Sequence, residues 1–183
     1  MKYFNEHKLL PGDILHVRTT TPYGWAIRKC LGSKGNHDAI LVNGYKGNWW
    51  VVEAVPNKGV TFTNLKKYEE KIENGAKVSV YRVPNTTNNE KWKAQSIAGD
   101  NIKSGKGYDW GAVFGILLRT NRWGNEWKWY CTELVRDAWK YAGHDVWKKD
   151  LPTPYTTEKR VKEGKLLDVT MEVLTEAGRK FAL

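Results

Sequence analysis

The sequence predicts an α+β fold, with an antiparallel sheet, or a small barrel of the same strands, covered by helices on one face. Strand-like runs fill the first half of the chain and helix-like segments the second, and the connection between two central runs is short and turn-rich. The 183 residues are 40% hydrophobic, which is enough for a buried core, and no repeat or linker interrupts them. We therefore expect a single domain over residues 1–183.

Each element follows from a local pattern. The sequence LLPGD is a turn that leads into the first strand, and NGYKGN separates two strongly apolar strands. Apolar residues at helical spacing mark the helices, and the glycine at position 143 is of a type that commonly ends one. The expected strands span 14–18, 38–42, 49–55, 60–62 and 77–83, and the expected helices span 22–31, 64–73, 89–104, a segment from about 109, and 131–143.

The chain carries a net charge of +10, from 30 Lys and Arg against 20 Asp and Glu. Such a balance favours contact with an anionic partner, such as nucleic acid, membrane headgroups or an acidic wall polymer. The alternative is a lysine surface that serves solubility. No run of basic residues is dense enough to mark a nucleic-acid-binding arm, so we regard nucleic acid as the less favoured partner.

Two cysteines, Cys30 and Cys131, are too few for a disulfide framework. The N-terminal sequence lacks a signal-peptide core, and no run of 18 apolar residues occurs. We expect a soluble protein that is cytoplasmic or released by a non-classical route. Neither a metal-ligand spacing nor a glycine-rich phosphate loop is present, so we expect no metal and no cofactor.

The segment WYCTELVRDAWKYAG is the most informative part of the chain. Cys131 stands at the predicted start of a helix and shares the apolar face of Leu134 and Val135, which is turned towards the sheet. Free N–H groups and the dipole of the first turn stabilise a thiolate and can donate to an oxyanion. These features favour a nucleophile; the alternative is a buried structural cysteine.

A nucleophilic cysteine needs a base, and four histidines are candidates. His7 lies in a polar stretch, and His144 follows the far end of the cysteine helix, too distant from the thiol. His16 and His37 both lie in predicted strands. A carboxylate that could orient the imidazole distinguishes His37 from His16.

Glu53 lies among Trp, Val and Ala in an apparently buried strand, where a carboxylate needs a partner. If residues 43–47 form a five-residue hairpin loop, Val42 pairs with Asn48 and His37 lies directly opposite Glu53 on the same face. The carboxylate would then orient the imidazole. The alternatives are an exposed edge-strand carboxylate at Glu53 and His16 as the base.

Four motifs in this order, LLPGDIL, NHDAILV, VVEA and YCTELV, resemble the circularly permuted papain-like hydrolases of the YiiX-like group, related to NlpC-type peptidases and lecithin:retinol acyltransferase-like proteins. Thr132 stands where that group usually has serine. The resemblance implies Cys131 as nucleophile, His37 as base and Glu53 as the orienting residue. Through the Gly-Tyr-Asp element, it also implies that Tyr108 lines the site as an oxyanion or substrate donor; the alternative for Tyr108 is a packed aromatic.

The implied reaction is acyl transfer on an amide or ester bond through an acyl-enzyme. Cell-wall peptide, glycopeptide and lipid-linked substrates all fit, and an anionic envelope polymer suits the basic charge. One alternative is an acyltransferase of the same fold. The other is a non-catalytic module that binds nucleic acid or an anionic polymer on Trp and basic residues.

Overall fold

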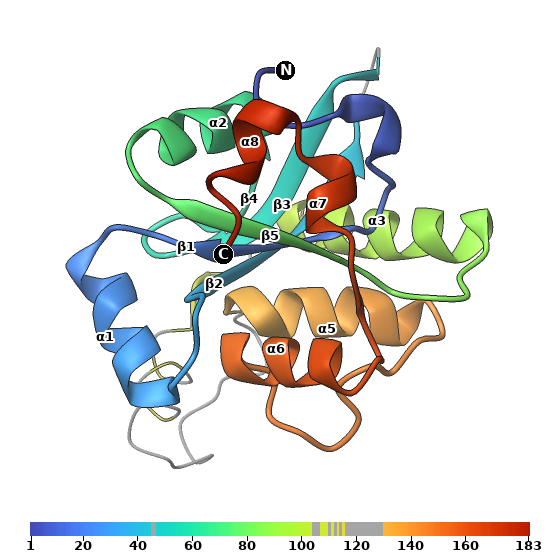
Figure 1. The fold of residues 1–183 in the computed structure, drawn as a ribbon. Coiled ribbons are helices and arrows are strands. Elements are labelled where there is room, and N and C mark those ends of the chain that lie inside the picture. Colours follow the sequence, from blue (N-terminus) through green and yellow to red (C-terminus); the bar gives the residue numbers. More distant parts are fainter. Residues whose placement is uncertain (45–46, 104–106, 110, 112, 114, 116–129) are drawn as a thin grey trace.

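The computed structural model describes residues 1–44, 47–103, 107–109, 111, 113, 115 and 130–183. Six strands form one antiparallel sheet in the order β4-β3-β2-β1-β5-β6 (Figure 1). The strands are β1 (Ile14–Arg18), β2 (His37–Asn43), β3 (Trp49–Val55), β4 (Gly59–Asn64), β5 (Lys77–Arg82) and β6 (Leu167–Asp168). The helices are η1 (Glu6–Lys8), α1 (Pro22–Leu31), α2 (Leu65–Glu73), α3 (Asn88–Lys103), α5 (Cys131–Tyr141), α6 (Pro154–Lys162), α7 (Thr170–Val173) and α8 (Glu176–Arg179).

Helices cover both faces of the sheet, which corrects the expectation of one covered face. Figure 1 shows α3, α5 and α6 on one side and α2, α7 and α8 on the other. Adjacent residues of β1 enter different cores: Ile14 packs in the core that contains Leu134 of α5, and Leu15 in the core that contains Tyr68 of α2. The near-continuous apolar runs of β2 and β3 are typical of strands buried on both faces.

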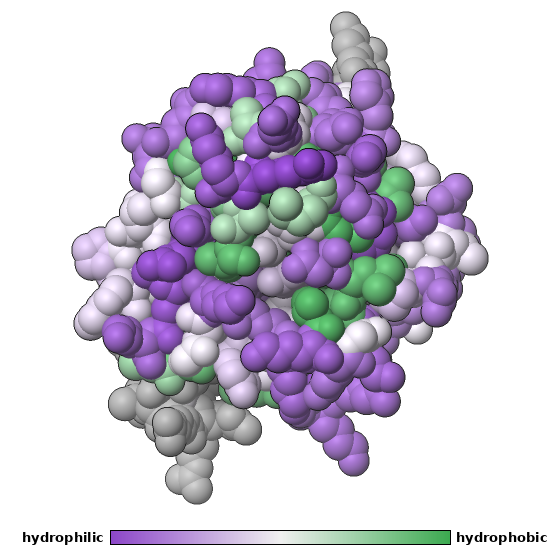
Figure 2. Space-filling model, viewed as in Figure 1, coloured by the Kyte–Doolittle hydropathy of each residue, from purple (hydrophilic) through white to green (hydrophobic). Residues whose placement is uncertain are grey.

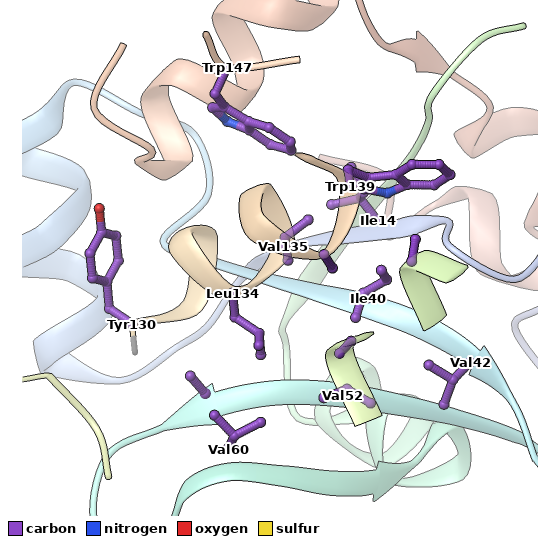
Figure 3. Packing of buried hydrophobic residues seen from close by; sticks show 14 of the residues in the cluster. Ile14, Ile40, Val42, Val52, Val60, Tyr130, Leu134, Val135, Trp139 and Trp147 are labelled. Atoms are coloured by element: carbon purple, nitrogen blue, oxygen red, sulfur yellow. The ribbon is translucent and has the colours of Figure 1, made fainter. Parts of the chain in front are cut away.

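The core beneath α5 fixes that helix to the sheet (Figure 3). Leu134 and Val135 are fully buried against the apolar side chains of β2 and β3. Trp139 is 1% exposed, and its Nε1 donates a hydrogen bond of 3.1 Å to the carbonyl of Gly12. Each such large apolar side chain contributes roughly 1.5–3 kcal/mol on burial. The start of α5 is therefore held at a defined position over the strands.

The hairpin between β2 and β3 has a different register from the one expected. Asn43 pairs with Trp49 and Val42 with Trp50, so the loop begins one residue later than predicted and the pairing moves by two residues. Because side chains alternate along a strand, a two-residue shift leaves each one on the same face. His37 and Glu53 are therefore diagonal neighbours on one face instead of directly opposed residues.

The expected ranges of most strands and helices are confirmed. Helix α5 begins at Cys131, and Gly143 follows its end with a positive φ of 107°. Helix α3 occupies the predicted range, with Ala94 and Ala98 buried and Trp92 51% exposed. The predicted helix from about residue 109 lies mostly outside the described residues. None of the helices described has the length and apolarity needed to cross a bilayer.

Candidate active site

Cys131 is the first residue of α5 and is 6% exposed. The residue before the helix, Tyr130, gives it no side-chain cap. In contrast, α1 and α6 are capped by the hydroxyls of Thr21 and Thr153. The thiol therefore lies beside backbone N–H groups of the first turn that this cap position does not engage, and these can donate to an anion.

Glu53 and His37 meet where β2 begins and β3 ends. Nε2 of His37 lies 2.8 Å from Oε2 of Glu53, and the hydroxyl of Tyr68 donates to the same oxygen at 2.6 Å. Glu53 is 2% exposed and belongs to the interior strand β3, so it is not an exposed edge-strand carboxylate. Burial alone would raise the pKa of Glu53, but the hydrogen bond from His37 and the charges of His37 and Lys71 lower it well below its usual range. The carboxylate is ionised.

His37 also interacts with Cys131. Burial alone would lower the pKa of His37, but its interactions with the Cys131 side chain and with Glu53 raise it to about 10. Because Nε2 faces Glu53, Nδ1 is the ring nitrogen left for the sulfur. Glu53, His37 and Cys131 are thus neighbours in the structure, and a catalytic role for the three stays a prediction.

A narrow cavity of about 20 Å³ lies beside the sulfur, roughly the room of one water molecule. Tyr108 is one of its walls and is 7% exposed, and its hydroxyl lies 3.0 Å from that of Tyr23. Burial and the neighbouring Cys131 charge raise the pKa of Tyr108 far above its usual value, so its hydroxyl keeps its proton. The other walls are mainly apolar, and the full lining is Ile27, Leu31, Asn36, Tyr108, Val113, Tyr130, Cys131, Thr153 and Pro154.

His16, the other contender for the base, lies in a separate buried network. Its Nδ1 is 2.6 Å from Oδ1 of Asp38, and its Nε2 is 3.0 Å from Oε1 of Glu158. Since both ring nitrogens face carboxylate oxygens, both carry protons, and no lone pair is left to accept one. Burial would lower the pKa of His16, but these carboxylates raise it to about 9.

The same network reaches the residue after the candidate nucleophile. Oδ2 of Asp38 accepts hydrogen bonds from the hydroxyls of Thr132 at 2.7 Å and Thr157 at 2.9 Å. The Thr132 hydroxyl is 3.8 Å from the sulfur of Cys131. A serine would offer the same hydroxyl, so the threonine at this position keeps the contact with Asp38.

The two remaining histidines are remote from the thiol. His7 is exposed in η1. His144 follows α5, and its Nε2 lies 3.1 Å from Oε1 of Glu90 on α3. Cys30 is exposed on α1 and forms no disulfide.

The sequence analysis did not identify three residues that contact Glu53 or His16. Tyr68, which donates to Glu53, lies on a helix whose packing against β3 no local motif predicts. Asp38 follows His37 on β2, and its carboxylate accepts a hydrogen bond from Thr132 of α5, a contact that no local motif predicts. Glu158 comes from α6, 142 residues beyond His16, and only the tertiary structure brings it to the network.

A cysteine at the start of a helix that packs on an antiparallel sheet is the arrangement of papain-like enzymes, here with the cysteine placed after most of the strands in the sequence. The chain belongs to the C92 peptidase family, described as permuted papain-like amidase enzymes of the YaeF/YiiX type, and the match covers residues 8–170.

One solved structure extends this comparison. The chain is similar to the crystal structure of metalloprotein yiiX from Escherichia coli O157:H7 (DUF1105), with a TM-score of 0.58 and 26% identity over 94% of this chain and 92% of that one. No curated protein matches the chain in sequence.

Proposed function

We propose that the protein is a cysteine-dependent amidohydrolase that cleaves an amide or ester bond through an acyl-enzyme. Cys131 is the nucleophile, His37 the general base and acid, and Glu53 the residue that orients the imidazole. The observation that carries this proposal is the chain of contacts from the Glu53 carboxylate through His37 to the Cys131 sulfur. It rests on the family only for the general class of cysteine hydrolase.

In this mechanism, His37 holds the proton of the thiol, and the raised pKa of its imidazole keeps the proton there. The sulfur attacks the carbonyl carbon, and the oxyanion is stabilised by the backbone N–H of Cys131. The carbon–nitrogen or carbon–oxygen bond then breaks as His37 protonates the leaving group. Water, deprotonated by His37, releases the acyl group as a carboxylic acid and regenerates the thiol.

Tyr108 is the proposed fourth member of the site. Its protonated hydroxyl belongs to the same cavity wall as Cys131, which suits a donor to the oxyanion or to the substrate. The hydrogen bond between the hydroxyls of Tyr23 and Tyr108 positions the Tyr108 ring.

The relation of this chain to NlpC-type peptidases stays a prediction.

The name of the E. coli relative raises the question of a metal. Within the described part of the chain, no group of three His, Cys, Asp or Glu side chains could hold one. The cluster of His16, Asp38 and Glu158 offers no imidazole lone pair, because both ring nitrogens are engaged by carboxylates. These residues do not fit a metal centre.

Replacement of Cys131 by alanine tests the proposal directly. We expect the variant to lose hydrolysis of small amide and ester substrates, and covalent labelling by iodoacetamide at this position, by about 10³-fold or more. A Cys30→Ala variant is the matched control, because that thiol is exposed and lies outside the site. If Cys131→Ala keeps full turnover, the proposal is wrong.

Two other functions remain candidates within this test. Product analysis with and without an added amine or alcohol acceptor separates a hydrolase from an acyltransferase. Only an acyltransferase transfers the acyl group to the acceptor in preference to water. A non-catalytic module that binds an anionic polymer or nucleic acid would show no turnover and unchanged binding in Cys131→Ala.

A further inference from the structure

A groove lies on the side of α1 that faces away from the Cys131 cavity. Two cavities of about 540 and 610 Å³ share Arg18, Trp25, Arg28 and Lys77, so they form one continuous depression, here called the α1 groove. Figure 2 shows hydrophilic side chains gathered between α1 and the C-terminus.

Helix α1 separates this groove from the candidate site. Its residues Ile27 and Leu31 line the cavity beside Cys131, whereas Trp25 and Arg28 line the groove. A helix with its side chains is about 10 Å across. A chain-like ligand in the groove would therefore lie about one helix diameter from the thiol.

The α1 groove is strongly cationic. The groove is lined by Arg18, Arg28, Lys29, Lys34 and Lys77, and no acidic side chain among the described residues lines either cavity. Among the residues that the structure describes, none of these five cations forms a salt bridge. Their charges are therefore available to a ligand.

The arrangement of these cations destabilises the folded protein. Arg18 and Lys77 are directly opposed across β1 and β5, and like charges in that position destabilise a sheet. Arg28 is held in place by Nη1, which donates to the Thr19 carbonyl at 3.0 Å and to Oδ1 of Asn36 at 2.9 Å. Burial and the charge of Arg18 both lower the pKa of the Arg28 guanidinium. An anion between these groups would relieve the repulsion.

We propose that the α1 groove binds a phosphodiester-linked polymer without stacking bases, and that this polymer carries the amide or ester bond attacked by Cys131. The inference rests on the proposed function. Guanidinium groups match the geometry of phosphate oxygens, and a continuous groove fits a chain. A flat membrane surface fits a recess poorly. A single-stranded nucleic acid uses successive aromatic platforms, whereas Trp25 is the one aromatic side chain of the described residues that lines either cavity.

Lys77→Glu tests the proposal with two readouts. The substitution places opposite charges across β1 and β5, so we expect a higher midpoint of thermal unfolding together with roughly tenfold weaker binding of long-chain inorganic polyphosphate. Lys66→Glu, at an exposed lysine of α2, makes the same change in net charge and should leave binding within about twofold. Equal losses in both variants would overturn the proposal, since only overall charge would then matter.

Binding is measured by calorimetry in the Cys131→Ala background, so that it does not depend on turnover. Single-stranded DNA of equal charge, or vesicles with anionic lipids, binding at least tenfold more tightly than polyphosphate would also overturn the proposal. Hydrolysis of a small neutral ester by Lys77→Glu should be unchanged. If the groove proposal is wrong, the protein still hydrolyses the ester, but polyphosphate binding does not depend on Lys77. If the proposed function is wrong, ester hydrolysis is absent while polyphosphate still binds.

Discussion

Two histidines on neighbouring strands, His37 and His16, have nearly the same surroundings and different chemical capacities. Both are paired with buried carboxylates, and both have a raised pKa. His37 gives one nitrogen to Glu53 and keeps the other for a thiol, whereas His16 gives both nitrogens to carboxylates. A histidine–carboxylate pair therefore indicates a catalytic base only where the second nitrogen remains available.

The first prediction would break this comparison if it failed. His37→Ala removes the base, and we expect kcat/KM to fall by about 10²- to 10⁴-fold with little change in fold. His16→Gln should keep kcat within about threefold at temperatures where the protein is folded. Steady-state kinetics on a small amide, with circular dichroism to check folding, measures both. If His16→Gln lost more activity than His37→Ala, the assignment of the base to His37 would be wrong.

The second prediction concerns stability. Asp38→Asn leaves the buried imidazolium of His16 without one of its counter-charges, and we expect a loss of about 3–5 kcal/mol in the free energy of unfolding. Urea denaturation of both proteins at pH 7 measures the difference. A change below about 1 kcal/mol would show that the network contributes little.

Glu53→Gln is the counterpart in the other pair and acts on rate. The amide can still accept from His37, but it no longer stabilises the imidazolium, so we expect kcat to fall by about 10²-fold or more. Tyr68→Phe removes only one hydrogen bond to the same carboxylate and serves as the control for a purely local change. Equal losses in the two variants would contradict an electrostatic role for Glu53.

The pH dependence of stability sharpens the comparison further. The pKa of His16 is about 9 in the folded protein and about 6.5 in an unfolded chain, so protonation stabilises the fold. This contribution is complete below pH 6.5 and is lost as the pH rises through about 9. We expect the midpoint of thermal unfolding to fall across that window, and to fall less in His16→Gln. A flat profile in the wild-type protein would exclude a charged His16.

Several features of the site could be predicted from the sequence because they depend on local patterns. The start of α5 at Cys131 follows from the spacing of Leu134 and Val135, and the shared face of His37 and Glu53 follows from strand alternation. The alternation survived the error in register because the error was an even number of residues.

The role of His16 could not be predicted in the same way. It depends on Glu158, which α6 brings from the far end of the chain, and no local motif encodes that approach. In contrast, the burial of both faces of the sheet could have been predicted. The uninterrupted apolar runs of β2 and β3 leave neither face suited to contact with solvent.

The loop between α1 and β2 has a consequence for anyone who wishes to redesign this enzyme. A Cβ atom built on Gly35 would lie 2.3 Å from Nε2 of His16, and the backbone N–H of Gly35 donates to Glu158 at 3.0 Å. A mutant library that randomises this loop should therefore return glycine at position 35 in every folded clone. The side chain of its neighbour Lys34 is exposed, so substitution there spares the fold but removes one cation from the α1 groove.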